Sequence, residues 1–205
     1  TSPALFALSL ASTLVTFGCG DDDENGGNGG NGGNGGDPSL TISGDPTDLT
    51  GRGDWGGLIL SGRGVINSGM ESGSEASPPQ NQRFFGGTDN IDDSGSLNYV
   101  IIAETGFAFR PGAEIQGLTL EAVGSGTELD YVQIIGSDDD CIEWFGGAAN
   151  MSHFVCNGVN DDALDMDTGY VGNVQFGSGR IGTTQGERGI ESDNAGDNFD
   201  LMPRT

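Results

Sequence analysis

Carboxylates recur at matching positions in the second half of the sequence, and they are the residues best suited to chemistry. Aligning residues 129–147 with residues 151–169 superimposes two pairs of adjacent aspartates and one further acidic position. Like charges that face one another on adjacent strands destabilise a sheet. Such a column requires a bound cation, protonation, or side chains that spread into solvent. The superimposed residues are Asp139, Asp140, Asp161 and Asp162 in the turns, and Glu143 and Asp165 on the strands that follow.

A third copy of the same unit extends this pattern into two parallel columns. We expect the members of a column to lie on successive strands about 4.8 Å apart and to point outward. Hard oxygen ligands of this kind suit Ca²⁺ rather than zinc. Two interpretations stay open: calcium bound at one of these acidic ladders, or solvated and purely structural turns. The columns are Glu143, Asp165 and Glu191, and beside them Phe145, Asp167 and Asp193.

A separate acidic loop, residues 88–95, offers another candidate calcium site. It places Asp89, Asp92 and Asp93 close together. The loop lacks the spacing and the terminal Glu of an EF-hand, so an ordinary solvated turn is the alternative.

Paired carboxylates also suggest general acid and base catalysis on a polysaccharide. The basic partners of such a site are scarce, because all seven basic residues of the chain are Arg. Arg188, near Glu191 and Asp193, is the one candidate, and pairs of this kind are commonly surface salt bridges. A formal charge of −24 would also repel polyanionic substrates. We therefore predict no catalytic residues and keep a lyase or glycoside hydrolase as the alternative function.

The elements that position these residues are short runs of β-branched and aromatic residues closed by Gly, Asn or Asp. No sustained helical period accompanies them. A repeat of about 20–22 residues without a helix is typical of one rung of a parallel β-helix. The sequence thus predicts an all-β, right-handed parallel β-helix over residues 39–205. Alternation predicts these core side chains: Val132, Ile134, Phe154, Cys156, Val174 and Phe176 on the first strand, and Ile142, Trp144, Leu164, Met166 and Ile190 on the second.

Cysteine, histidine and aromatic residues carry three further hypotheses. Cys141 and Cys156 would form a disulfide in an oxidising compartment if a corner at Asp140 turns Cys141 inward; otherwise they remain two thiols. The single His, His153, should align outward with Tyr131 and Asn173, in a structural role. Exposed aromatics could stack on sugars or simply pack with their neighbours. The aromatics considered are Tyr99, Tyr131, Phe145 and Phe85.

The N-terminal segment differs from the rest of the chain. Residues 4–17 are apolar or small and uncharged, which suits a signal-peptide core and is too short for a membrane span. Thr16-Phe17-Gly18-Cys19 resembles the lipobox of bacterial lipoproteins, in which the Cys is lipidated. Residues 1–18 are therefore predicted to be a signal peptide that begins within a longer leader. Residues 19–38 are predicted to be an acidic, Gly/Asn-rich flexible tether.

Net charge limits the partners of the folded part. Nucleic acid is excluded, because phosphate binding relies on clustered Lys and Arg. We expect an exported protein, anchored by lipid to the outer membrane or cell surface, with glycan or a surface protein as its partner.

Four stretches of the sequence resemble a group of secreted bacterial surface lipoproteins from Gram-negative species. The resemblance implies a parallel β-helix and export, and it implies no particular activity. Members of that group continue beyond the point that corresponds to Thr205, so we expect a longer native chain. We predict a non-catalytic surface binding, adhesion or structural module stiffened by Ca²⁺. The stretches are residues 52–64, 84–109, 114–147 and 189–194.

Overall fold

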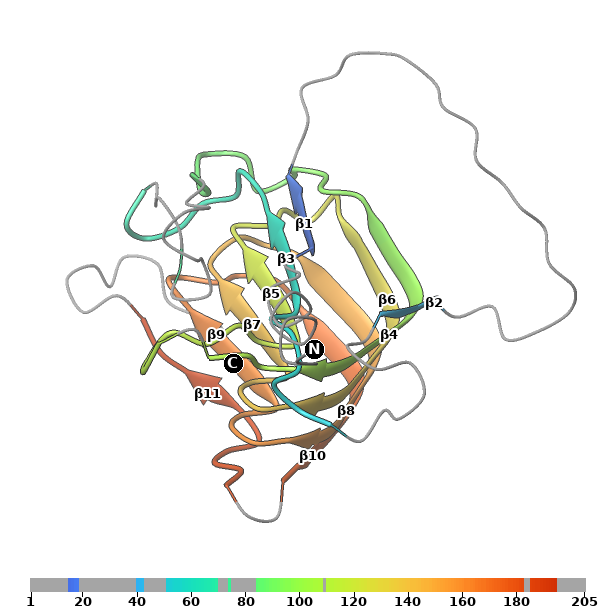
Figure 1. The fold of residues 1–205 in the computed structure, drawn as a ribbon. Helices are drawn as coiled ribbons and strands as arrows, with labels where there is room; N and C mark the ends of the chain where they lie inside the picture. The colour runs from blue at the N-terminus through green and yellow to red at the C-terminus, as the bar shows by residue number, and fades with distance from the viewer. Residues whose placement is uncertain are drawn as a thin grey trace, which may run out of the picture.

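The computed structural model describes residues 15–18, 40–42, 51–69, 74, 84–108, 110–182 and 185–194. Its strands form two sheets in which every paired neighbour is parallel. The chain alternates between the sheets, so that each turn of the chain adds one strand to each wall (Figure 1). This arrangement confirms the predicted parallel β-helix.

The first wall, sheet A, contains the short strands and carries the acidic columns. Its strands lie in the order β1-β3-β5-β7-β9-β11. Their bounds are β1 (Val15–Gly18), β3 (Leu58–Ser61), β5 (Leu118–Glu121), β7 (Ile142–Phe145), β9 (Leu164–Asp167) and β11 (Glu191–Ser192). The segment predicted to be a signal peptide thus includes a strand paired with β3. Cys19 lies outside the described residues, so its lipidation stays a prediction.

The second wall, sheet B, contains the long strands, in the order β10-β8-β6-β4-β2. Their bounds are β2 (Leu40–Ile42), β4 (Ser96–Thr105), β6 (Glu128–Ser137), β8 (Asn150–Val159) and β10 (Val174–Ile181). Within the described ranges, no helix is both long enough and apolar enough to cross a membrane.

The core lies between the walls and consists of stacked inward side chains. Leu118, Ile142 and Leu164 occupy one register position of sheet A, and all three are buried. Val132 and Phe154 face them from sheet B. One residue per strand therefore contributes to a continuous apolar column, which is how a repeat too small to have its own core becomes stable.

Corners of the helix are formed by residues with left-handed backbone conformation. Tyr99, Tyr131, His153 and Phe176 have φ between 50° and 58° and occupy equivalent positions on β4, β6, β8 and β10. A non-glycine residue rarely adopts this conformation. A second corner contains Glu104, with Gly136 and Gly158. Such a residue bends the strand and interrupts the strict alternation of inward and outward side chains.

The corner explains an error in the predicted core. Phe176 was expected inside, yet it is 67% exposed and stacks on His153. Gly177 takes the inward position opposite Phe154. The ring of Phe154 fills the space beside Gly177, where a Cβ would lie 1.9 Å from Cζ of Phe154. The same corner places His153 beside Tyr131, as predicted. On its other side His153 contacts Phe176 and not, as we had expected, Asn173. The Asn173 side chain forms a hydrogen bond with Asn150.

Ile190 was also expected in the core and is 57% exposed. It precedes β11, the last strand of sheet A in the described part of the chain. An apolar cavity of about 900 Å³ opens at this end, between Ile190, Leu164, Met166 and Tyr170. A core position in a solenoid is covered only when a further rung stacks on it.

Candidate metal centre

The central acidic column forms in the predicted register. Glu143 of β7 pairs with Asp165 of β9, which pairs with Glu191 of β11. The adjacent column also forms, because Phe145 pairs with Asp167. However, Glu143 is only 3% exposed, so this end of the column is buried, whereas the Glu191 side chain at the other end is 35% exposed.

Part of the connection between β3 and β4 packs against the outer face of sheet A. Ile66 and Phe85 form a small second core there with Phe145 and Ala122. The backbone N–H of Gly147 donates to the carbonyl of Val65, which holds this segment along the sheet. Of the two interpretations that the sequence left open for Phe85 and Phe145, packing with neighbours is therefore confirmed, because both rings are buried.

Two acidic triads share one residue at the start of this face. Asp140, in the turn before β7, lies with Glu143 and Asp165 so that one carboxylate oxygen of each is within 4.8 Å of the others. One carboxylate oxygen of Asp140 also lies within 4.8 Å of one each from Asp139 and Asp161, which form the second triad with it. From the sequence, we predicted the aspartates of the turn and the columns on the strands as separate sites. The three-residue separation of Asp140 and Glu143 around a corner was the signal that could have joined them.

Hydrogen bonds between adjacent rungs position the turn aspartates. Asp140 Oδ1 accepts a hydrogen bond from the backbone N–H of Asp162 at 2.9 Å. Between the same two turns, the side-chain amide of Asn160 donates to Asp138 at 2.6 Å. The two turn clusters therefore stack directly, as their alignment predicted.

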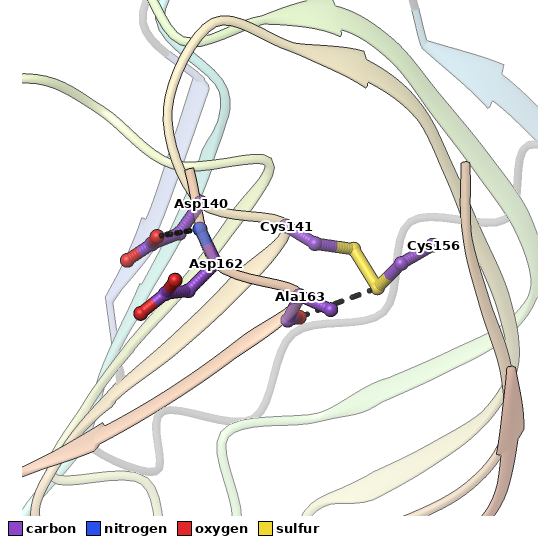
Figure 2. Close-up of a disulfide and its surroundings, with 5 residues drawn as sticks. All are labelled: Asp140, Cys141, Cys156, Asp162 and Ala163. Carbon is purple, nitrogen blue, oxygen red and sulfur yellow. Dashed lines mark hydrogen bonds between the residues drawn. A yellow bond between two sulfur atoms is a disulfide. The ribbon is translucent and has the colours of Figure 1, made fainter. Parts of the chain in front are cut away.

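The disulfide fixes the same turn to the opposite wall. Cys141 and Cys156 are bonded, with their Cα atoms 5.9 Å apart, and Figure 2 shows this bond beside Asp140 and Asp162. Both cysteines are buried, so the corner at Asp140 does turn Cys141 inward. The Cys156 sulfur lies 3.4 Å from the Ala163 carbonyl oxygen, a contact rather than a hydrogen bond because a disulfide sulfur carries no proton.

Crowding of the carboxylates changes their ionisation. Burial raises the pKa of Asp140 to about 9, and the neighbouring charge of Asp139 adds to this effect. Burial also raises the pKa of Asp165 to about 7, with a contribution from Glu191. Each shift means that the charged form is unfavourable without a compensating positive charge. A proton or a metal ion can supply that charge.

The donor set fits a hard divalent cation. Asp165 Oδ1 is shielded from solvent and has no hydrogen-bond partner, so one oxygen of the triad is available as a ligand. Carboxylate oxygens are the ligands that Ca²⁺ and Mg²⁺ prefer. The acidic residues could therefore bind a metal ion, and Asp140, Glu143 and Asp165 would hold it.

Other predicted ligands are engaged elsewhere. Asp162 accepts the backbone N–H of Arg188 at 2.6 Å, and Glu191 accepts its guanidinium at 2.8 Å. Asp167 and Asp193 each accept a backbone N–H from the next residue. In the 88–95 loop, the three aspartates bind the loop itself, so turn formation explains them. These hydrogen bonds are Asp89 with Ile91, Asp92 with Ser94, and Asp93 with Gly95.

Arg188, the candidate catalytic base, lies among carboxylates. Its guanidinium is 2.8 Å from Glu191 and 3.2 Å from Glu187. The charge of Glu191 raises the pKa of Arg188 further. A guanidinium held this way remains protonated at neutral pH, so it cannot remove a proton from a substrate.

Comparison with known proteins agrees with this architecture. The family model described as a pectate-lyase-like β-helix domain matches residues 33–205. Neither a curated protein nor a solved structure matches the chain. The match covers the acidic triads and every described strand except β1, and the family is compatible with a polysaccharide-related role. The chain therefore belongs to the family of pectate-lyase-like β-helix domains.

Proposed function

We propose that this chain is a non-catalytic, polysaccharide-binding β-helix module in which Ca²⁺ stiffens the acidic wall. One observation carries the proposal: Asp140, Glu143 and Asp165 bring three carboxylate oxygens within 4.8 Å of one another from a turn and two adjacent rungs. A cation bound there would join β7 to β9 and remove the repulsion between their charges. Its effect would be on the rigidity of the wall.

Burial favours a structural ion over a catalytic one. Asp140 is 7% exposed and Glu143 is 3% exposed. A metal ion that binds substrate needs coordination positions open to solvent. An ion held between these two buried side chains would have few coordination positions left open to solvent.

The polysaccharide part of the proposal is supported by the family and by the shape of the protein. A parallel β-helix presents long, rigid columns of outward side chains, which suits an extended polymer. We further propose export, lipidation at Cys19 and display on the outer membrane or cell surface.

Thermal unfolding with and without calcium tests the metal proposal. We expect the midpoint to rise on adding Ca²⁺ to EDTA-treated protein, by an amount that increases with ion concentration. Asp165→Asn should remove most of this increase. Asp193→Asn is the matched control, because it removes one exposed charge from the same wall without altering either triad. Equal midpoints in EDTA and in Ca²⁺ would rule out the ion.

Incubation with polysaccharides separates binding from catalysis. The protein should sediment with at least one insoluble or gel-forming polysaccharide and should release neither new reducing ends nor unsaturated products. Product formation that Asp165→Asn abolishes would replace our proposal with the enzyme alternative. Absence of binding to every polysaccharide tested would remove the glycan part and leave the metal part standing.

A further inference from the structure

A second concave surface lies away from the acidic triads, where β6, β8 and β10 begin. It is a shallow groove of about 650 Å³, and its lining is mainly polar. The side chains that the argument uses are Glu128, Asp130, Asn150, Ser152, Asn173 and Gln175.

The lining residues form two columns that run across the rungs. Glu128 is in register with Asn150, and Asp130 is in register with Ser152, which pairs with Gln175. Asn173 donates to Asn150 at 2.8 Å and continues the first column. Neighbouring rungs are about 4.8 Å apart, so the groove repeats hydrogen-bonding groups at a regular interval along the solenoid axis. A regular interval of polar groups suits a polymer with a repeating unit.

Amide and carboxylate side chains are good partners for a sugar. They offer planar arrays of donors and acceptors that match hydroxyl groups. Phe176 directly follows the lining residue Gln175 and is 67% exposed, but its ring lines the neighbouring apolar cavity and not this groove. The rings of Tyr131 and His153 stack at 4.6 Å, and the rings of His153 and Phe176 stack at 5.2 Å. The ring faces that meet in these two contacts are covered and cannot stack on a sugar. Of these three rings, Phe176 is the one that could stack on a sugar.

Charge decides which class of sugar the groove accepts. Two of its lining residues, Glu128 and Asp130, are acidic, and none is Lys or Arg. The chain as a whole carries a formal charge of −24. A uronic acid polymer would meet repulsion at the β6 rung, which carries both acidic residues, whereas a protonated sugar amine would be attracted there.

We propose that this groove binds a polysaccharide bearing free amino groups, with Glu128 contacting the ammonium. This inference rests on the proposed polysaccharide-binding function and adds the site and the ligand class. Glu128 is exposed, and its carboxylate accepts hydrogen bonds from Ser96 at 3.0 Å and from Asn98 at 2.9 Å. Those two contacts hold the carboxylate at the edge of the groove.

Calorimetric titration of the whole chain with glucosamine oligosaccharides tests the proposal. The measurement is made below the pKa of the sugar amine and at about 0.15 M salt, where long-range attraction is screened. N-acetylglucosamine oligosaccharides and galacturonate oligosaccharides of equal length are the comparison ligands. We expect the free amine to bind at least tenfold more tightly than either, a difference of about 1.4 kcal/mol or more.

Variants separate the groove from the general acidity of the protein. Glu128→Gln should weaken glucosamine binding about tenfold, and Gln175→Ala should weaken it less. Asp193→Asn changes the net charge equally on the other wall and should leave the affinity unchanged. Equal losses in Glu128→Gln and Asp193→Asn would overturn the proposal in favour of unspecific attraction. Unchanged unfolding midpoints show that the variants fold.

Failure of this inference can be told apart from failure of the proposed function. If a neutral or acidic polysaccharide binds and Glu128→Gln has no effect, the groove assignment is wrong and polysaccharide binding stands. If none of the polysaccharides binds, the groove assignment and the proposed polysaccharide binding are both wrong.

Discussion

The acidic wall and the aromatic corner stack residues in the same way with opposite energetic results. On sheet A, Glu143 and Asp165 face each other in register, and their charges repel. At the corner of sheet B, the rings of Tyr99 and Tyr131 lie 4.6 Å apart and nearly parallel, and they attract. A parallel β-helix repeats whatever chemistry a position carries. The corner is therefore stabilised by its own residues, whereas the wall needs a proton or a cation from outside.

The largest expected effect is a pH dependence confined to the wall. The pKa values of Asp140 and Asp165 in the folded protein, about 9 and about 7, lie above the ordinary aspartate value of 3.8. The folded protein therefore binds more protons than the unfolded chain, and stability falls as pH rises. In EDTA, the free energy of unfolding should decrease between about pH 4 and pH 9, by at most about 1.4 kcal/mol per pH unit for each group.

Calcium and a ladder variant provide the controls for this pH dependence. Saturating Ca²⁺ should flatten the decrease above about pH 7, because the ion replaces the protons. Tyr131→Ala should lower the free energy of unfolding by the same amount at every pH, without changing its slope against pH. Denaturant titrations across this pH range make the measurement. A free energy of unfolding that rises with pH in EDTA would contradict the assignment of raised pKa values.

A second effect comes from the disulfide, which ties the wall to sheet B. Cys141 and Cys156 are separated by 15 residues and enclose β7. Replacing both with Ala should lower the free energy of unfolding by about 3 kcal/mol, the value for a loop of this size. The variant should also bind Ca²⁺ more weakly, because Asp140 adjoins Cys141. Reduction of the wild-type protein should reproduce the loss, and an unchanged midpoint would mean that the bond contributes nothing.

The smallest effect should come from substitutions at the corner, and there Gly should be tolerated better than Ala. Tyr131 stacks on Tyr99 and His153 with a φ of 52°. Tyr131→Ala removes both stacking contacts, about 0.5–1.5 kcal/mol each, and keeps the backbone strain. Tyr131→Gly removes the same contacts and relieves strain of about 1 kcal/mol. Gly should therefore be less destabilising than Ala in chemical denaturation. The opposite order would mean that the corner is not strained.

Residue patterns predicted the rungs more reliably than the corners. The repeat placed Glu143 on Asp165 correctly, because stacking in register is a translation by one repeat. The inward positions of Val132 and Ile134 were also correct. Phe176 was wrong because the left-handed corner falls on a non-glycine residue, and local propensity does not indicate this conformation. The pattern left the solvation of the wall open, because Ile66 and Phe85, which cover Phe145, come from a segment far away in the sequence.

By itself, the sequence determined the repeat, the parallel architecture and the list of acidic residues that share a column. Those properties depend on residue type and spacing along the chain. Only the tertiary structure decided that Asp140 joins Glu143 and Asp165 and that Glu143 is buried. These outcomes depend on how a corner turns and on which distant segment packs over a face, and neither is recorded in the local pattern.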